Sequence, residues 1–172
     1  MRHIGAAAVV VLIGAMPALA AELPTRKAGL WEVKMSFANR NGASPLIQQC
    51  IDAATDQAMM ASAGPLAQGA CPKRDVQRSG NTITMDSTCT LSGKTATSHA
   101  VITGSFDSAY TMTVESQSES LPGGKMNMTI DAKWLGPCAA DQKPGDMIMP
   151  GGIKMNILEI QKRGASQGGP PR

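Results

Sequence analysis

The chain has 172 residues, with 16 basic and 13 acidic side chains and only five aromatic ones. A chain of this size can bury enough apolar surface to fold as one domain without a metal or a partner. Its charges of both signs are dispersed along the chain. The basic stripe with interleaved aromatics that is typical of nucleic-acid binding is absent from the sequence, so we exclude that class.

The first twenty residues have the layout of a secretory signal peptide. Arg2 is positively charged, residues 4–16 are apolar, Pro17 breaks the helix, and Ala18 and Ala20 are small. The apolar run is shorter than the roughly 20 residues of a membrane span, and no lipobox cysteine lies near the cut. We therefore expect cleavage after Ala20, which leaves a mature chain of 152 residues that does not span a membrane.

Two strands and a helix are predicted in the first part of the mature chain. Apolar and polar side chains alternate over residues 31–37, which indicates a half-buried strand, and a shorter strand follows over 45–52. Residues 52–64 are rich in Ala, Gln and Met and favour a helix that Asp52 or Thr55 can cap.

From residue 71 the pattern is strand and turn, with alternating runs separated by Gly-containing turns. Parallel strands would need long crossovers, so short turns predict an antiparallel meander. One face of these strands is apolar and the other is rich in Thr. The expected fold is mainly β (α+β): a curved antiparallel sheet of about seven strands with one internal helix and a short C-terminal helix, in a single domain over residues 21–163.

The C-terminal region is rich in Gly and Pro except for residues 153–163. There Ile153, Ile157 and Ile160 share one face of a helix, which predicts a short amphipathic helix. The alternative is a weakly ordered flap, because short helices are marginal unless they are packed. Residues 164–172 are predicted to be disordered.

The four cysteines all lie after the predicted cleavage site, and an even count in an exported protein predicts two disulfides. No two of them are spaced as in C-x-x-C, so neither a zinc site nor a thiol redox motif is expected. A turn signal lies midway between Cys71 and Cys89. A three-residue loop over 79–81 would place these two cysteines opposite each other, whereas a two-residue loop over 79–80 would set them one position out of register, which a bulge would reconcile.

Two pairings are therefore considered. The favoured one joins Cys71 to Cys89 across the hairpin and leaves Cys50 to join Cys138 at the end of the last long strand. The other joins Cys50 to Cys71 around the helix, and Cys89 to Cys138.

No catalytic residue and no cofactor are assigned. The mature chain has one histidine, His99, and the adjacent Ser98 points to the opposite face of a strand, so the two cannot act together. A carboxylate-dependent hydrolase remains an alternative, because an acid pair can form across strands. The carboxylates considered are Asp86, Asp107, Glu115, Glu119 and Asp131.

Methionine is unusually abundant, with ten residues in the mature chain. Thioethers are soft ligands that favour Cu(I), so a soft-metal site at Met147, Met149 and Met155 is one hypothesis. For Met126 and Met128 core packing is favoured, because they share a strand face with other apolar residues.

The apolar face of the sheet needs a cover, either the helices or a ligand. We predict a non-catalytic, monomeric binding or envelope-maintenance module that receives an apolar ligand or an envelope component on this concave face. The residues expected to line it are Trp31, Met35, Met112, Met128 and Trp134.

Three strings are distinctive in combination: RKAGLWEV from residue 26, QQCID from residue 48, and AKWLGPC from residue 132 with QKPGD after it. Together they resemble the DUF3617 family, small exported proteins of Gram-negative bacteria, over about residues 26–152. The family pattern has cysteines at the four positions found here. The resemblance implies a periplasmic location and a one-domain architecture, and it assigns no activity.

Overall fold

The protein is described by a computed structural model, which covers residues 23–38, 44–62, 71–91 and 93–167. The strands are β1 (Gly29–Phe37), β2 (Leu46–Ile51), β3 (Lys73–Ser79), β4 (Thr82–Leu91), β5 (Lys94–Ser105), β6 (Ala109–Ser118), β7 (Lys125–Gly136), β8 (Asp146–Ile148) and β9 (Lys154–Asn156). The helices are α1 (Ala53–Ser62), the single-turn η2 (Pro122–Gly124) and α2 (Ile157–Gln167). The predicted signal peptide lies outside the described residues.

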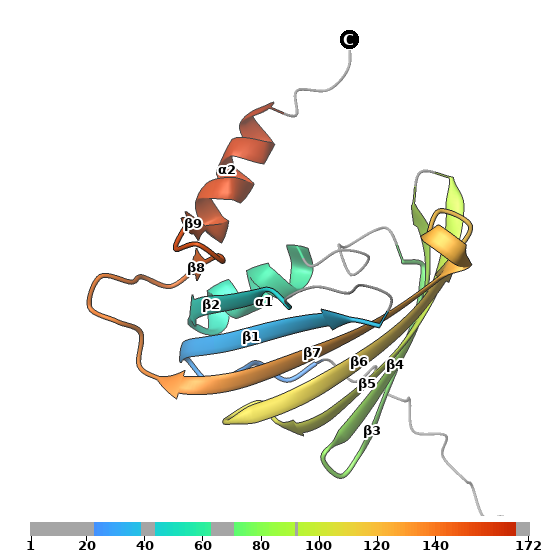
Figure 1. Ribbon diagram of the computed structural model, residues 1–172, viewed down its shortest axis with the longest axis horizontal. Coiled ribbons are helices and arrows are strands. Elements are labelled where there is room, and N and C mark those ends of the chain that lie inside the picture. Colours follow the sequence, from blue (N-terminus) through green and yellow to red (C-terminus); the bar gives the residue numbers. More distant parts are fainter. Residues whose placement is uncertain (1–22, 39–43, 63–70, 92, 168–172) are drawn as a thin grey trace, which may run out of the picture.

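All nine strands belong to one antiparallel sheet with the order β3-β4-β5-β6-β7-β1-β2-β8-β9. The sheet is strongly curved, and α1 lies on its concave side, while α2 extends away from the sheet (Figure 1). The predicted class, a mainly-β antiparallel sheet with an internal and a C-terminal helix, is confirmed. The sheet has two more strands than expected, the three-residue strands β8 and β9.

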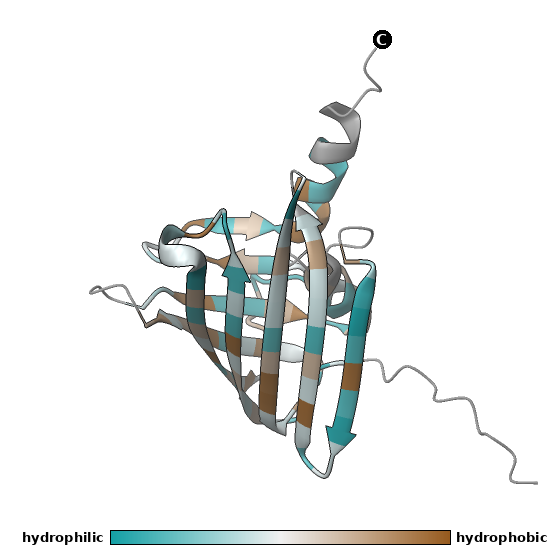
Figure 2. Ribbon diagram, turned by 90° about the vertical axis from the view of Figure 1, so that its right-hand side faces the viewer, coloured by the Kyte–Doolittle hydropathy of each residue, from teal (hydrophilic) through white to brown (hydrophobic). Residues whose placement is uncertain are grey.

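Alternation along the strands gives the sheet an apolar concave face and a polar convex face. In β5, for example, Ala96, Ala100 and Ile102 are buried, whereas Thr97 and Thr103 are exposed. Figure 2 shows the resulting apolar and polar bands along the strands. This pattern is the one expected of an antiparallel sheet with a single solvated face.

The packed core centres on Trp31 of β1, which is completely buried. Its ring centroid lies 5.8 Å from that of Tyr110, which in turn stacks on Phe106 at 4.7 Å. The indole nitrogen donates a hydrogen bond to the carbonyl of Lys27 at 2.8 Å, so the one polar atom of the side chain is satisfied. Trp31 is therefore a core residue, buried at one end of the concave face.

The helix α1 begins where the side chain of Asp52 caps it. Oδ1 of Asp52 accepts a hydrogen bond from the backbone nitrogen of Thr55 at 2.8 Å, and Oγ1 of Thr55 accepts one from the backbone nitrogen of Asp52 at 2.9 Å. This reciprocal pair satisfies two backbone donors at the helix start. The hydrogen bonds from Thr55 lower the pKa of Asp52, because they stabilise its ionised form.

The hairpin of β3 and β4 has a different register from either one considered from the sequence. Ser79 pairs with Thr82, so the loop consists of Gly80 and Asn81. Gly80 has a φ of 60°, a conformation that suits a two-residue hairpin turn. Both predicted loops, over 79–81 and over 79–80, are therefore wrong.

The C-terminal helix is displaced from its predicted position. Residues 154–156 form β9, which pairs with β8, and Ile153 before it is exposed, so Ile153 does not share a helix with Ile157. The helix begins after Asn156, whose Oδ1 accepts a hydrogen bond from the backbone nitrogen of Leu158 at 3.1 Å and so acts as an N-cap. It continues to Gln167, so residues 164–167, predicted to be disordered, are helical. Residues 168–172 lie outside the described residues.

Candidate functional site

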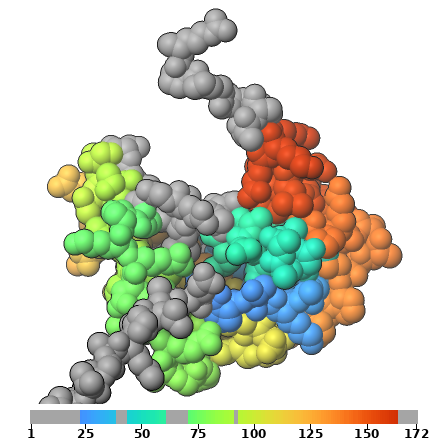
Figure 3. Space-filling model, turned by 180° about the vertical axis from the view of Figure 1, so that it is seen from behind, coloured from blue at the N-terminus to red at the C-terminus, as the bar shows by residue number. Residues whose placement is uncertain are grey.

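A cavity of about 360 Å³ lies on the concave face between α1 and the sheet. Its wall is formed by α1 and by strands on both sides of β7, and it carries seven of the ten methionines of the predicted mature chain. These are Met35, Met59, Met60, Met85, Met112, Met126 and Met128. In the space-filling view of Figure 3, α1 lies between α2 and the N-terminal segment that includes β1, and β3 and β4 lie on the opposite side of the molecule.

The strand register explains why the methionines gather there. Met35 on β1 and Met112 on β6 are both direct partners of Ile130 on β7. Met128 precedes Ile130 by two residues on β7 and therefore lies on the same face. Directly opposed residues of antiparallel strands point to the same side. From the other side of the cavity, α1 contributes Met59 and Met60.

A row of serines crosses the same face next to the methionines. Ser87 on β4 is the direct partner of Ser98 on β5, which is the direct partner of Ser116 on β6. The Oγ atoms of Ser98 and Ser116 are 2.9 Å apart and form a hydrogen bond. Ser87 and Ser116 are each 7% exposed, and all three serines line the cavity. We call these three residues the serine row.

A buried ion pair closes the cavity at the α1 side. Nε of Arg26 donates to Oδ1 of Asp56 at 2.7 Å, the backbone nitrogen of Arg26 donates to Oδ2 at 2.7 Å, and Nη1 donates to Oε1 of Gln49 at 2.9 Å. The side chains of Arg26 and Asp56 are only 6% and 3% exposed. The pair therefore fastens α1 to the segment before β1 and leaves this end of the cavity without net charge.

Tyr110 lies beside this pair on the cavity wall. Burial raises the pKa of its hydroxyl, and the charge of Asp56 acts in the same direction, while Arg26 opposes them. Tyr110 is consequently neutral at physiological pH. With Arg26 matched by Asp56, the described wall of the cavity is apolar with a small number of neutral polar groups.

Three of the five residues predicted to line an apolar face do so: Met35, Met112 and Met128. Trp31 is part of the packed core instead. Trp134 is half-buried outside the cavity wall, where its indole nitrogen donates to the carbonyl of Ala28 at 3.1 Å and Nζ of Lys27 lies 3.7 Å from its ring centroid.

The structure also places the methionines of the soft-metal hypothesis. Met147 and Met155 are direct partners across β8 and β9, and Met149 lies just after β8, where its backbone nitrogen donates to the carbonyl of Ile153. The backbone register thus places two of the three residues opposite each other. Among the described residues, no three His, Cys, Asp or Glu side chains form a group that could hold a metal ion.

His99 lies on the convex face, away from the cavity. Its Nδ1 is 2.7 Å from Oδ1 of Asp86, and the two side chains are 49% and 58% exposed. Ser98 lines the cavity on the opposite face, as strand alternation predicts. The register extends this row to Asp75 and Glu115 on the flanking strands.

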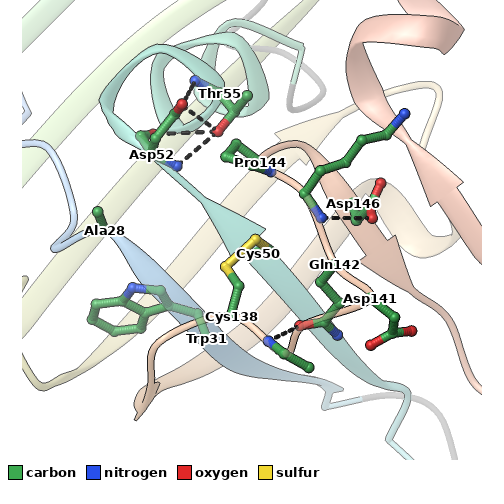
Figure 4. Close-up of a disulfide and its surroundings, with 12 residues drawn as sticks. Ala28, Trp31, Cys50, Asp52, Thr55, Cys138, Asp141, Gln142, Pro144 and Asp146 are labelled. Atoms are coloured by element: carbon green, nitrogen blue, oxygen red, sulfur yellow. Dashed lines mark hydrogen bonds between the residues drawn. A yellow bond between two sulfur atoms is a disulfide. The ribbon is translucent and has the colours of Figure 1, made fainter.

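The cysteines form the two favoured pairs. Cys71 joins Cys89, with a Cα–Cα distance of 3.8 Å, and Cys50 joins Cys138, with a distance of 5.5 Å. The second disulfide ties β2 to the segment that follows β7, close to the α1 cap (Figure 4). Both disulfides are therefore part of the scaffold that holds the cavity wall.

Neither described α-helix is long and apolar enough to cross a membrane.

Several residues of the cavity wall, and the ion pair that closes the cavity, were not predicted from the sequence. Met59 and Met60 were recognised only as helix-forming residues, and the serine row depends on a register that the sequence did not define. Arg26 and Asp56 are 30 residues apart in the chain, so nothing in the sequence pairs them.

No curated protein and no solved structure matches this chain. A family model described as "Protein of unknown function (DUF3617)" matches residues 26–138, which include most of the strands and all four cysteines. The match covers more than half of the chain and shows that it belongs to the DUF3617 family.

Proposed function

We propose that this protein is an exported, periplasmic, non-catalytic binding protein that takes up an apolar small molecule in the methionine-lined cavity. The observation that carries the proposal is the cavity itself. Its volume of about 360 Å³ falls within the roughly 300–1,000 Å³ of small-molecule sites. Its wall is apolar with a few placed polar groups, which is the usual composition of such sites.

The methionines support binding of a flexible or variable ligand. Methionine is unbranched and has three rotatable side-chain bonds, so a wall built from it can adapt to the shape of what it contacts. Seven methionines on one cavity wall give this adaptability on both the sheet side and the α1 side. A wall of branched residues would hold one fixed shape instead.

The periplasmic location is supported by the predicted signal peptide and by the two disulfides. Disulfides form and persist in oxidising compartments such as the bacterial periplasm, and are rare in the cytosol. The resemblance of the sequence to the DUF3617 family implies the same location.

A fluorescent apolar probe, 1-N-phenylnaphthylamine, tests the proposal, because its emission rises in an apolar environment. Ala100 lies on the cavity wall and is 2% exposed, so Ala100→Phe should fill the cavity and abolish the fluorescence increase. The matched control is Ala109→Phe, since Ala109 is exposed on β6 and should leave probe binding unchanged.

A second cavity-filling variant guards against misfolding of the first. Val114 is the direct partner of Ala100 and also lines the cavity, so Val114→Phe should have the same effect. Thermal unfolding of each variant establishes that it folds. Failure of the folded wild-type protein to bind the probe, or undiminished binding by both folded variants, would refute the proposal.

A further inference from the structure

The serine row is a polar feature within an apolar wall. The residues of this concave face form rows of direct partners that run across the strands. Met85, Ala100, Val114 and Met128 form one row of direct partners. The next row along the strands is Ser87, Ser98 and Ser116, and it ends at Met126 on β7. The concave face therefore changes from apolar to hydrogen-bonding within two residues along each strand.

The serine row has unused hydrogen-bonding capacity. A hydroxyl has one donor and two acceptor sites, and the bond between Ser98 and Ser116 uses one donor and one acceptor of the pair. The side chain of Ser87 also lines the cavity and makes no hydrogen bond to another residue that the structure describes, while no buried side-chain nitrogen or oxygen atom among the described residues lacks a partner. The hydroxyls of the serine row therefore keep donors that bond no other described residue.

The charges around the cavity restrict which ligand group can accept a hydrogen bond from the serine row. Arg26 is the only charged residue of the described wall, and Asp56 already neutralises it at 2.7 Å. A charged group drawn into this cavity would have no counter-charge and would lose its hydration. The oxygen that meets the serine row is therefore that of a neutral group.

The volume limits the buried part of the ligand. A water molecule takes up about 30 Å³ in the liquid, and a carbon of a packed alkyl chain is of similar size, so 360 Å³ holds roughly a dozen heavy atoms. The methionines on both sides suit a chain that bends.

Building on the proposed function, we propose that the ligand is a neutral single-chain amphiphile, an ester, amide or alcohol with a chain of about ten to twelve carbons. Its carbonyl or hydroxyl oxygen accepts a hydrogen bond from the serine row. Its chain lies among the methionines.

Competition with 1-N-phenylnaphthylamine tests this inference using three compounds with the same chain length. These are glycerol monododecanoate, which is neutral, dodecanoate, which is anionic, and dodecyltrimethylammonium, which is cationic, each below its micelle-forming concentration. The neutral compound should displace the probe at a concentration at least tenfold lower than either charged one. Equal or better displacement by a charged compound would overturn the inference.

A variant of the serine row supplies the second arm. Ser87→Ala combined with Ser116→Ala should weaken binding of the neutral compound by roughly tenfold, because each hydrogen bond contributes a net 0.5–1.5 kcal/mol or so. Thermal unfolding establishes that the double variant folds, and the control Ser79→Ala, at an exposed position on β3, should change the affinity for neither the neutral compound nor the probe. An unchanged affinity for the neutral compound in the double variant would overturn the inference while leaving the proposed function in place. A wild-type protein that binds no probe would overturn both.

Discussion

Asp56→Ala should destabilise the protein severely, because it removes the one counter-charge that the described part of the chain gives to a buried guanidinium. Arg26 is 7% exposed and donates two hydrogen bonds of 2.7 Å to Asp56, one from its side chain and one from its backbone. Breaking a buried ion pair by removing one partner costs about 3–5 kcal/mol. The free energy of unfolding of an ordinary domain is about 5–15 kcal/mol, so the loss would be a large part of it.

Urea unfolding monitored by tryptophan fluorescence measures this loss, since the Arg26 guanidinium lies 5.6 Å from the centroid of the Trp31 ring. The matched control is Glu159→Ala, which breaks the exposed pair with Lys143 and should cost far less. The double replacement Arg26→Met with Asp56→Leu should be less destabilised than Asp56→Ala alone, because no buried charge is left unpaired. An Asp56→Ala variant no less stable than Glu159→Ala would refute this reasoning.

Three further predictions concern the scaffold. Replacing Cys50 and Cys138 by Ala opens a loop with a sequence separation of 88 and should lower the free energy of unfolding by up to about 4.6 kcal/mol. Denaturant titration measures this loss. A loss no greater than the one caused by removing the shorter disulfide would contradict the prediction. Burial favours a higher pKa for Asp146, but its hydrogen bonds and Lys154 outweigh burial and lower the pKa. The ionised form of Asp146 therefore stabilises the fold above the unfolded pKa of about 3.9, and this contribution is lost as the pH falls through the lower folded pKa. The difference in melting temperature between wild type and Asp146→Asn should consequently be larger at pH 7 than at pH 3. Equal differences at the two pH values would contradict this prediction. Gly104 has a φ of 116°, and a Cβ at this position would come within 2.5 Å of the carbonyl oxygen of Ala109. Gly104→Ala should therefore lower the melting temperature of the protein. An unchanged melting temperature would show that the backbone relaxes freely.

The strands and their two faces follow from local sequence. Alternation identified the apolar face of β7, and it placed His99 and Ser98 on opposite sides of β5, as the structure has them. The strands β8 and β9 were missed because three residues are too few to show alternation. They form because β2 and a glycine-rich turn hold them, which is an effect of distant residues.

The cavity was only partly predictable. Alternation assigned Trp31 and Met35 correctly to one face, but it does not say which positions along the strand are covered by the core and which are left open. The serine row needed the register of three strands, and that register is set by the connections from Leu91 to Lys94 and from Ser105 to Ala109, which the sequence did not define. The contact of α1 with Arg26, in the segment before β1, depends on how the chain closes in space, so no local pattern predicts it.

The position of ligand contact can be measured directly by NMR of protein labelled with ¹³C at the methionine methyl groups. During titration with 1-N-phenylnaphthylamine, signals from the seven cavity methionines should shift. Met147, Met149 and Met155 lie outside the cavity wall and serve as internal controls whose signals should stay in place. Shifts confined to these three, or no shift in any methionine while the probe binds, would contradict the central claim that the methionine-lined cavity is the binding site.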